Sequence, residues 1–423
     1  MSMNWEQLLS SVRLSHPELP DAKRSAFHKD YGRVLYSSAF RRLQDKTQVF
    51  PLGRNDYVRT RLTHSLEVAN VGGSLAMELT DVAENREGSI PGLQAAAGEI
   101  VATACLAHDI GNPPFGHSGE TAIEEAVQES ISQGLCDSEF RDFRFEGNAQ
   151  GFRLLTRTCD PIRGMGLDLT AATLGAFTKY PCCKKGVYKK FGLNADELER
   201  FREVAALCGL PEIEENTWAR HPLAYLMEAA DDISYLIADM EDAVVSKIIR
   251  YEEAVEQLAR LCGFEARTLD SIERERVRSG PLAAMRYVRA RAIGTCIANL
   301  RGAIEQHYDA LMNGTLRSSL MQSSCMAEAY REVQQFSLQH IYSHESVVKI
   351  EITGFNVIKS LMELFLKWVR DPSLPLSRKI GAILHADPQL EGSPRYRFLH
   401  VVDYISGMTD SFALQTYNTL FGK

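Results

Sequence analysis

The stretch from Cys105 to Glu120, CLAHDIGNPPFGHSGE, constrains how this chain folds more than any other. An apolar run from residue 100 leads into adjacent His108 and Asp109, and the residues Gly-Asn-Pro-Pro follow at once. Proline cannot continue a helix and biases the residue before it away from helical angles. We therefore expect His108 and Asp109 at the C-terminal end of a buried helix. His117 and Glu120 follow the loop, three residues apart, where we expect a new helix to begin.

An adjacent His-Asp pair has an ordinary explanation as well as a functional one. Such a pair is common by chance, and a buried histidine is more often a hydrogen-bonded core residue than a metal ligand. Here two imidazoles and two carboxylates surround one Gly/Pro loop, which indicates a site. The metal hypothesis therefore depends on whether the rest of the chain supplies further ligands.

Most of the remaining chain has the 3- and 4-residue apolar spacing of helices, and convincing alternating strands are absent. At best, residues 346–353 form one short hairpin strand, although 345–370 also has helical spacing. We predict a mainly all-α fold with at most a short β-hairpin. We expect an N-terminal arm at 1–20, a helical core at 21–250 and a helical C-terminal region at 251–423. Further predicted features are a loop at 51–56, a linker at 82–92, a helix over 286–316 with a break near Gly302, and a helical tail over 396–420.

Composition excludes several classes of protein. The 423 residues are 45% hydrophobic and 24% charged, as in soluble globular proteins. A formal net charge of −8 argues against a general nucleic-acid coat protein. We find no apolar run of the roughly 20 residues that span a bilayer, and no secretory signal. The nine cysteines form no CxxC motif, which favours reduced thiols and a cytoplasmic protein.

A second informative stretch is AYLMEAADDISYLIADMEDA within residues 221–247. Asp231, Tyr235 and Asp239 follow one another at four-residue intervals and so share one helix face. That stripe is either a solvated acidic face or a buried polar site that meets a cation or a sugar hydroxyl. With His64 and His108-Asp109, an aspartate from the Asp231-Asp232 pair would complete a set suited to a divalent ion such as Mn, Fe, Co, Ni, Mg or Zn.

Basic residues near these groups suggest phosphate binding. Arg61 lies about one helical turn before His64 and can present a forked guanidinium to phosphate, and Arg59 lies two residues earlier. Five lysines gather within residues 179–190, namely Lys179, Lys184, Lys185, Lys189 and Lys190. The alternative for most of these lysines is an ordinary solvated loop.

These motifs resemble one known family. FRRLQDKTQVFPL, RTRLTHSLEV, HDIGNPPFGHSGE, FEGNAQG, EAADDISYLIADMEDA and DYISGMTD occur in this order. They are similar to the bacterial dGTP triphosphohydrolases (dGTPases) of the HD phosphohydrolase superfamily, and the resemblance covers residues 24–410. It implies an HD-domain helical core and metal-dependent hydrolysis of dGTP, or other dNTPs, to a deoxynucleoside and tripolyphosphate. Water attacks the α-phosphorus in that reaction.

The resemblance also implies site residues. Mn²⁺ or Mg²⁺ would be held by His64, His108, Asp109 and Asp231. His117 and Glu120 would be the catalytic pair beside the α-phosphate. The sugar would lie against Gln48, Tyr235 and Asp239, the phosphates against Arg61, Asn148, Lys179 and Tyr180, and the base against Tyr342 and Glu351.

One departure from the family pattern concerns a phosphate-side arginine, for which Arg370 and Arg378 are both candidates. Two alternative functions remain: an HD enzyme acting on another nucleotide, such as a nucleoside monophosphate or an alarmone, and a non-catalytic nucleotide or single-stranded DNA sensor. The Lys184–Lys190 cluster is our candidate contact for single-stranded DNA. The resemblance further implies a homo-oligomer, either a dimer or tetramer or a hexamer built from dimers, with contacts from the C-terminal region.

Overall fold

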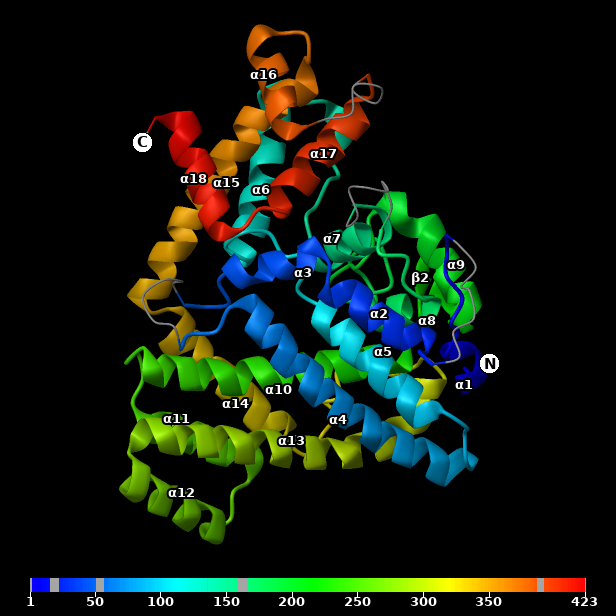
Figure 1. Ribbon diagram of the computed structural model, residues 1–423, viewed down its shortest axis with the longest axis vertical. Helices are drawn as coiled ribbons and strands as arrows, with labels where there is room; N and C mark the ends of the chain where they lie inside the picture. Colours follow the sequence, from blue (N-terminus) through cyan, green and yellow to red (C-terminus); the bar gives the residue numbers. More distant parts are fainter. Residues whose placement is uncertain are drawn as a thin grey trace.

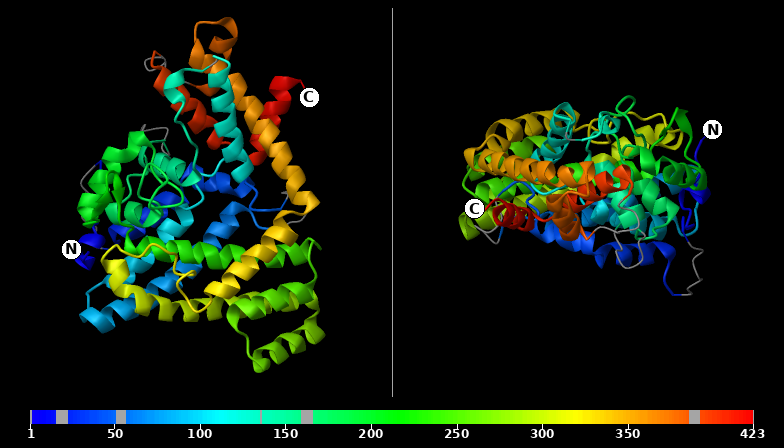
Figure 2. Two further views of the ribbon diagram at one scale, coloured as in Figure 1. Left: turned by 180° about the vertical axis from the view of Figure 1, so that it is seen from behind. Right: turned by 90° about the horizontal axis from the view of Figure 1, so that it is seen from above.

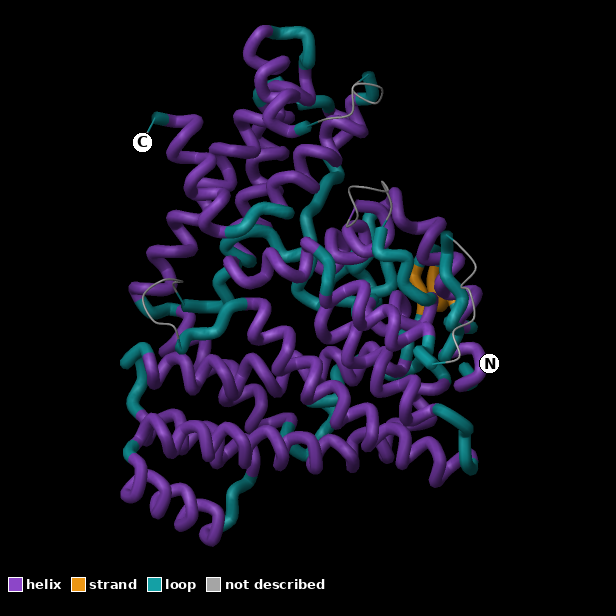
Figure 3. The backbone as a smooth tube through the Cα atoms, in the orientation of Figure 1, coloured by secondary structure: helices purple, strands orange, loops and turns teal. Residues whose placement is uncertain are grey.

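The computed structural model describes residues 2–15, 23–50, 57–134, 136–158, 166–385 and 392–422. Helices make up most of the structure of these residues, which confirms the predicted all-α class (Figure 1, Figure 3). Within these ranges the only strands are β1 (Glu212–Glu214) and β2 (Thr217–Trp218), an antiparallel pair. The predicted loop at 51–56 and residues 16–20 of the predicted arm lie outside the described residues.

The α-helices are α1 (Trp5–Leu8), α2 (Ala26–Leu35), α3 (Ser38–Arg42), α4 (Arg61–Glu87), α5 (Leu93–Ala107), α6 (His117–Ser132), α7 (Gly147–Arg153), α8 (Ala171–Phe177), α9 (Leu198–Cys208), α10 (Pro222–Val245), α11 (Tyr251–Cys262), α12 (Ala266–Ser279), α13 (Pro281–Met312), α14 (Ala327–Ser337), α15 (Glu345–Arg370), α16 (Pro375–Leu384), α17 (Pro394–Ser406) and α18 (Asp410–Phe421). The short 3₁₀ segments are η1 (Leu43–Asp45), η2 (Ser138–Phe140) and η4 (Ala195–Glu197), and the π-helical segments are η3 (Leu154–Thr158) and η5 (Leu338–Tyr342). None of the described helices combines the length and the apolar composition that a membrane crossing requires.

The structure corrects four local predictions. Residues 346–353 are the first turns of α15 and not a strand, because the apolar residues that follow continue at helical spacing against α6. Helix α4 extends through the first half of the predicted linker, and α13 continues unbroken past Gly302. The predicted tail helix is interrupted at Gly407 and forms α17 and α18. The charged helix α12 was missed.

A large hydrophobic core lies where α4 crosses α5, α10 and α13, in the lower half of Figure 1. Gly72 on α4 faces α5 at this crossing. A Cβ atom at Gly72 would lie 2.6 Å from Cys105 Sγ and 2.9 Å from Val101 Cγ1, so α5 approaches α4 more closely than any larger residue allows. The close approach brings His64 of α4 near the end of α5.

A second hydrophobic core joins α6 to α15, α16, α17 and α18, and it forms the upper part of Figure 1. Phe140 and Phe398 stack there with ring centroids 4.0 Å apart. Helix α15 runs from the region of α10 and α14 up into this second core, as the view from behind shows (Figure 2). The start of α6, which carries His117 and Glu120, therefore lies between the two cores.

Candidate functional site

Three helices bring His64, His108 and Asp231 together. The ligating atoms of these residues lie within 4.8 Å of one another. Asp231 Oδ1 lies 3.2 Å from His64 Nε2 and 3.5 Å from His108 Nε2. His64 is in the first turn of α4, His108 caps α5 and Asp231 is on α10. Since 167 residues separate His64 from Asp231 in sequence, only the packing of α4 on α10 joins them.

The surroundings of His108 suit a metal ligand. Its Nδ1 lies 2.7 Å from the main-chain oxygen of Cys105, so an Nδ1–H donates to that oxygen and leaves the Nε2 lone pair directed at Asp231. A backbone partner that fixes the tautomer in this way is usual for metal-bound histidine. Two imidazole nitrogens and a carboxylate oxygen fit a divalent ion with N/O preference.

Electrostatics keep Asp231 ionised. Burial alone would raise the pKa of Asp231, but the two histidines and the Lys179 charge outweigh burial and hold it well below its usual value. In contrast, burial raises the pKa of its neighbour Asp232 to about 8. Of the two aspartates left open by the helix spacing, Asp231 is therefore the one that faces the histidines as a carboxylate.

Asp109 is held differently from the other three residues. One oxygen is 3.0 Å from Arg61 Nη1, and the other is 3.6 Å from His108 Nε2 and accepts a hydrogen bond from Asn112. Burial would raise the pKa of Asp109, but Arg61 and the histidines lower it. Asp109 thus lies at the edge of the cluster as an ionised carboxylate, and Arg61 is already engaged with it.

His117 and Glu120 form a hydrogen-bonded pair at the start of α6. His117 Nδ1 lies 2.7 Å from Glu120 Oε2, while the Gly147 N–H donates to Glu120 Oε1 at 2.7 Å. Burial opposes the charge of Glu120, but these hydrogen bonds and nearby positive charges lower its pKa. The His117 side chain is 82% exposed, whereas that of Glu120 is 14% exposed. The His117 imidazole is therefore open to solvent, while its Nδ1 is held by a Glu120 carboxylate that the Gly147 N–H fixes in place.

Three of the residues expected around the sugar and base, Tyr235, Asp239 and Tyr342, take part in two groups of hydrogen bonds. Tyr342 donates to Asp239 Oδ2 at 2.6 Å. Gln334 Nε2 on α14 donates to both Tyr235 and Tyr330 at 2.8 Å. The sequence reasoning missed Tyr330 and Gln334, although their four-residue separation on a helix was a readable signal.

Lys179 and Tyr180, expected at the phosphates, are fixed by residues that the sequence reasoning also missed. Lys179 Nζ is 3.6 Å from Glu228, which accepts from Arg220 Nη1 at 2.7 Å. The Arg220 guanidinium lies 5.0 Å from the ring centroids of Tyr180 and Tyr188. These rings and Glu228 hold a dense cationic cluster beside α10.

The remaining expected residues differ in their surroundings. Asn148 donates to Glu146 at 2.8 Å, and Gln48 has a buried Oε1 atom without a hydrogen-bond partner. The side chain of Glu351 is exposed and forms no hydrogen bond or ion pair with another described residue. Arg370 and Arg378 are exposed at and beyond the far end of α15, so neither is brought to the histidines. Arg59 is engaged by three carboxylates, those of Glu67, Glu241 and Asp242, which leaves it unsuited to phosphate.

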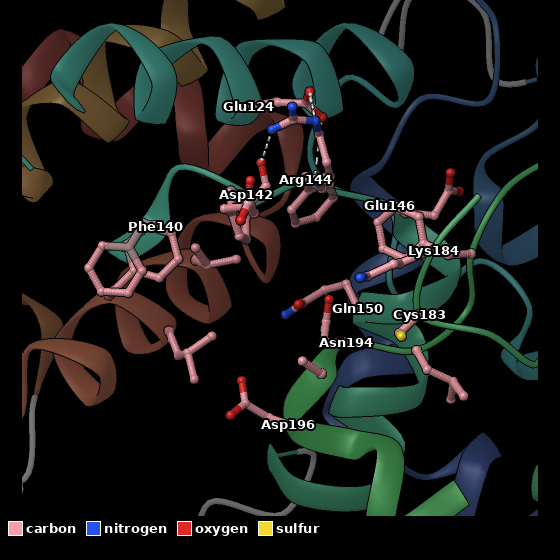
Figure 4. Close-up of a pocket in the computed structure, with 18 of the residues that line it drawn as sticks. Glu124, Phe140, Asp142, Arg144, Glu146, Gln150, Cys183, Lys184, Asn194 and Asp196 are labelled. Carbon is pink, nitrogen blue, oxygen red and sulfur yellow. Dashed lines mark hydrogen bonds and ion pairs between the residues drawn. The ribbon is translucent and has the colours of Figure 1, made fainter. Parts of the chain in front are cut away.

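A cavity of about 560 Å³ lies beside this site, between the two cores (Figure 4). Its walls carry Arg144 beside Glu124 on one side and Asp196 on the other, with Glu146 and Lys184 at one end. None of the four expected metal ligands lines it, but its wall at Glu146 adjoins Gly147 and Asn148. The cavity is therefore a neighbour of the site and not the site itself.

Comparisons with known proteins agree with this geometry. Residues 61–148 match the HD domain, and residues 320–419 match the phosphohydrolase-associated domain. A Synechocystis protein named deoxyguanosinetriphosphate triphosphohydrolase-like is 38% identical over 99% of both chains. A Pseudomonas aeruginosa protein of the same name is 37% identical over 100% of this chain and 99% of its own.

A Salmonella protein named deoxyguanosinetriphosphate triphosphohydrolase is 31% identical over 99% of this chain and 97% of its own. These matches run along essentially the whole length of each protein, and the histidines and aspartates that converge in the structure lie on the HD-domain segment and on α10. The chain therefore belongs to the deoxyguanosinetriphosphate triphosphohydrolase family of HD-domain hydrolases.

Proposed function

We propose that this protein hydrolyses dGTP, and other dNTPs to a lesser degree, to the deoxynucleoside and tripolyphosphate in the cytoplasm. The observation that carries the proposal is the convergence of His64, His108 and Asp231 within 4.8 Å, in the same chain as a preformed His117–Glu120 pair. The names of the relatives support the choice of dGTP.

His64, His108 and Asp231, with Asp109 at the edge, would hold Mn²⁺ or Mg²⁺. When bound, such an ion polarises phosphoryl oxygens and lowers the pKa of water. The ionised Asp231 and the oriented His108 Nε2 present their lone pairs without rearrangement. Arg61 keeps Asp109 ionised and adds positive charge beside the developing charge of the α-phosphoryl group.

His117 and Glu120 would handle the proton. Glu120 accepts the Nδ1–H of His117, which directs the opposite ring nitrogen outward. In the protonated form that Nε2–H donates to the departing 5′ oxygen as water attacks the α-phosphorus from the other side. The leaving group is then the neutral deoxynucleoside, and tripolyphosphate carries the phosphorus and the new oxygen.

We propose the substrate contacts that the family resemblance implies. Lys179 and Tyr180 would bind the phosphates, together with Asn148. Tyr235, Asp239 and Gln48 would hold the sugar, with the Tyr235 ring crowding a ribose 2′ hydroxyl. Tyr342, which is hydrogen-bonded to Asp239, would contact the base. The exposed Glu351 would reach guanine only if the substrate extends along α15.

The test is product analysis. Purified protein is incubated with Mn²⁺ or Mg²⁺ and each of the four dNTPs or GTP, and the products are separated by ion exchange. We expect deoxynucleoside and tripolyphosphate, fastest from dGTP and lost in Asp231→Ala. Pyrophosphate or phosphate as product would favour an HD hydrolase of another nucleotide. No turnover, with dNTPs mixed or DNA added, would favour a nucleotide or DNA sensor.

We also propose single-stranded DNA as a partner of the basic loop, and a homo-oligomeric state, a hexamer or a dimer or tetramer. Lys184, Lys185 and Lys189 are exposed, whereas Lys190 is 3.4 Å from Glu146. Binding through the three exposed lysines should weaken steeply with salt. Oligonucleotide affinity that does not change with salt, or is absent, would contradict the DNA proposal, and light scattering decides the oligomeric state.

A further inference from the structure

We infer that the C-terminal segment Asp403–Asp410, sequence DYISGMTD, together with Lys46, fixes the loop that presents His117 and Glu120. Asp410 and Lys46 would be positioning residues that touch the loop and not the substrate. The inference deepens the proposed function, because it assigns a role to a motif outside the HD domain. The inference rests on contacts to two residues of the loop, Asn112 and Phe115.

The first contact is a carboxylate that binds two main-chain N–H groups. Asp410 is only 7% exposed and lies at the start of α18. Its Oδ1 accepts from the Phe115 N–H at 2.9 Å, and its Oδ2 accepts from the Thr47 N–H at 2.8 Å. The Asp410 side chain thus connects the segment at Thr47 to the loop that precedes His117.

The backbone at this contact needs support. Phe115 has φ +61°, a left-handed conformation that is unfavourable for a residue with a Cβ atom, and Gly116 follows with φ +58°. The Phe115 ring packs against Gly354 of α15, where a Cβ atom would lie 2.3 Å from Phe115 Cγ. Strained conformations persist where the surroundings over-determine them. Here Asp410 holds the N–H and α15 holds the ring, and helix α6 begins two residues later at His117.

The second contact comes from a buried lysine. Lys46 is 2% exposed, and its Nζ donates to the main-chain oxygens of Asn112 at 2.5 Å and Ser406 at 2.9 Å. Asn112 immediately precedes the two prolines of the loop. The single Nζ group of Lys46 therefore joins the end of α17 to the other side of the same loop.

The C-terminal segment is itself anchored to α7. Asp403 accepts two hydrogen bonds from Arg153 and one from Gln150, all at 2.8 Å. Ser411 donates to Asp45 at 2.8 Å on the outer side of α18. These anchoring hydrogen bonds involve neither Asp410 nor Lys46, so a substitution at either residue leaves them in place.

Asp410→Asn is the main test, because its amide group replaces one acceptor oxygen by a donor that faces an N–H. Ser411→Ala is the control, since it removes a neighbouring bond that does not touch the loop. Hydrogen–deuterium exchange followed on peptides covering residues 110–120 should become about ten-fold faster in Asp410→Asn. In Asp410→Asn, exchange in α10 should match that of the unaltered protein. In Ser411→Ala, exchange of the loop peptides should also match that of the unaltered protein. Unchanged loop exchange in folded Asp410→Asn would overturn the inference, whether or not the protein hydrolyses dNTPs.

Kinetics provide the second readout. In Asp410→Asn we expect kcat to fall by about 10- to 100-fold, because a displaced catalytic pair loses alignment. KM and Mn²⁺ affinity should stay within about two-fold, which general destabilisation would not produce. A normal kcat with a loosened loop would remove the positioning role. Absence of dNTP turnover in the unaltered protein would refute the proposed function. The exchange rates of the loop would still decide whether Asp410 fixes the loop.

If Asp410→Asn does not fold, Lys46→Met replaces it. The thioether chain fills the space of the lysine and donates to neither carbonyl. We expect the same faster exchange over residues 110–116. If the loop in Lys46→Met exchanges as slowly as in the unaltered protein, the inference is overturned for Lys46 as well.

Discussion

The phenol of Tyr342 donates a hydrogen bond of 2.6 Å to Asp239 Oδ2, joining the segment before α15 to the polar face of α10. Burial raises the pKa of Asp239 to about 7, and the Tyr342 bond opposes that rise. The two residues lie 103 positions apart in sequence. The C-terminal region thereby reaches the face of α10 that also carries Asp231.

Tyr342→Phe should therefore weaken both stability and substrate binding. Without the hydroxyl, the pKa of Asp239 rises above 7 and the carboxyl is mainly neutral at neutral pH. We expect a loss of about 1–3 kcal/mol in the free energy of unfolding and a KM increase larger than any fall in kcat. Urea unfolding and dNTP kinetics measure the two effects. Tyr36→Phe is the control because Tyr36 is 78% exposed, and equal effects in both variants would contradict the prediction.

Glu120→Gln should lower kcat by about 10²- to 10⁴-fold. The amide can neither keep the charge that stabilises a protonated His117 nor satisfy Gly147 and His117 equally well. Mn²⁺ affinity, measured by calorimetry, should not change. Glu124→Gln, one turn later on the same helix, should keep full activity. A kcat within a few-fold of the unaltered protein in Glu120→Gln would exclude it from catalysis.

Metal affinity should depend on pH through His64. Burial opposes its charged form, but the hydrogen bond and charge of Asp231, with Asp109 and Asp239, raise the pKa of His64 above its usual value. The proton must leave before a metal binds, so Mn²⁺ affinity should fall about ten-fold per pH unit below that pKa. For the same reason His64 stabilises the metal-free fold at low pH, and this contribution disappears as the pH rises through the raised pKa. Calorimetric titrations between about pH 6 and 8.5 test this, and an affinity independent of pH would contradict it.

Gly72→Ala and Gly73→Ala should have opposite effects. The new methyl group at Gly72 would overlap Cys105 and Val101 of α5, at an expected cost of about 1–3 kcal/mol. A methyl group at Gly73 would meet no atom within 4 Å, and alanine should stabilise α4 by about 0.5–1 kcal/mol. Because α5 ends at His108, Gly72→Ala should also weaken Mn²⁺ binding. Equal unfolding free energies for the two variants would show that α5 moves away without cost.

Local sterics and helix periodicity determined much of this protein from its sequence. The two prolines ended the helix at His108, as expected, and the four-residue spacing placed Asp231, Tyr235 and Asp239 on one face of α10. The same local reasoning was wrong for residues 346–353. Their β-branched side chains suggested a strand, but packing of α15 against α6 overrides that local preference.

Only the tertiary structure decided which of these faces meet. The contact of His64 with Asp231 depends on the close crossing of α4 with α5 and α10, and the contact of Asp410 with Phe115 spans 295 residues. Spacing along one helix says which side chains share a face, but not which other helix that face buries. That choice depends on side-chain volumes at crossings such as Gly72, and on buried polar groups such as Lys46 and Asp410 that must find partners.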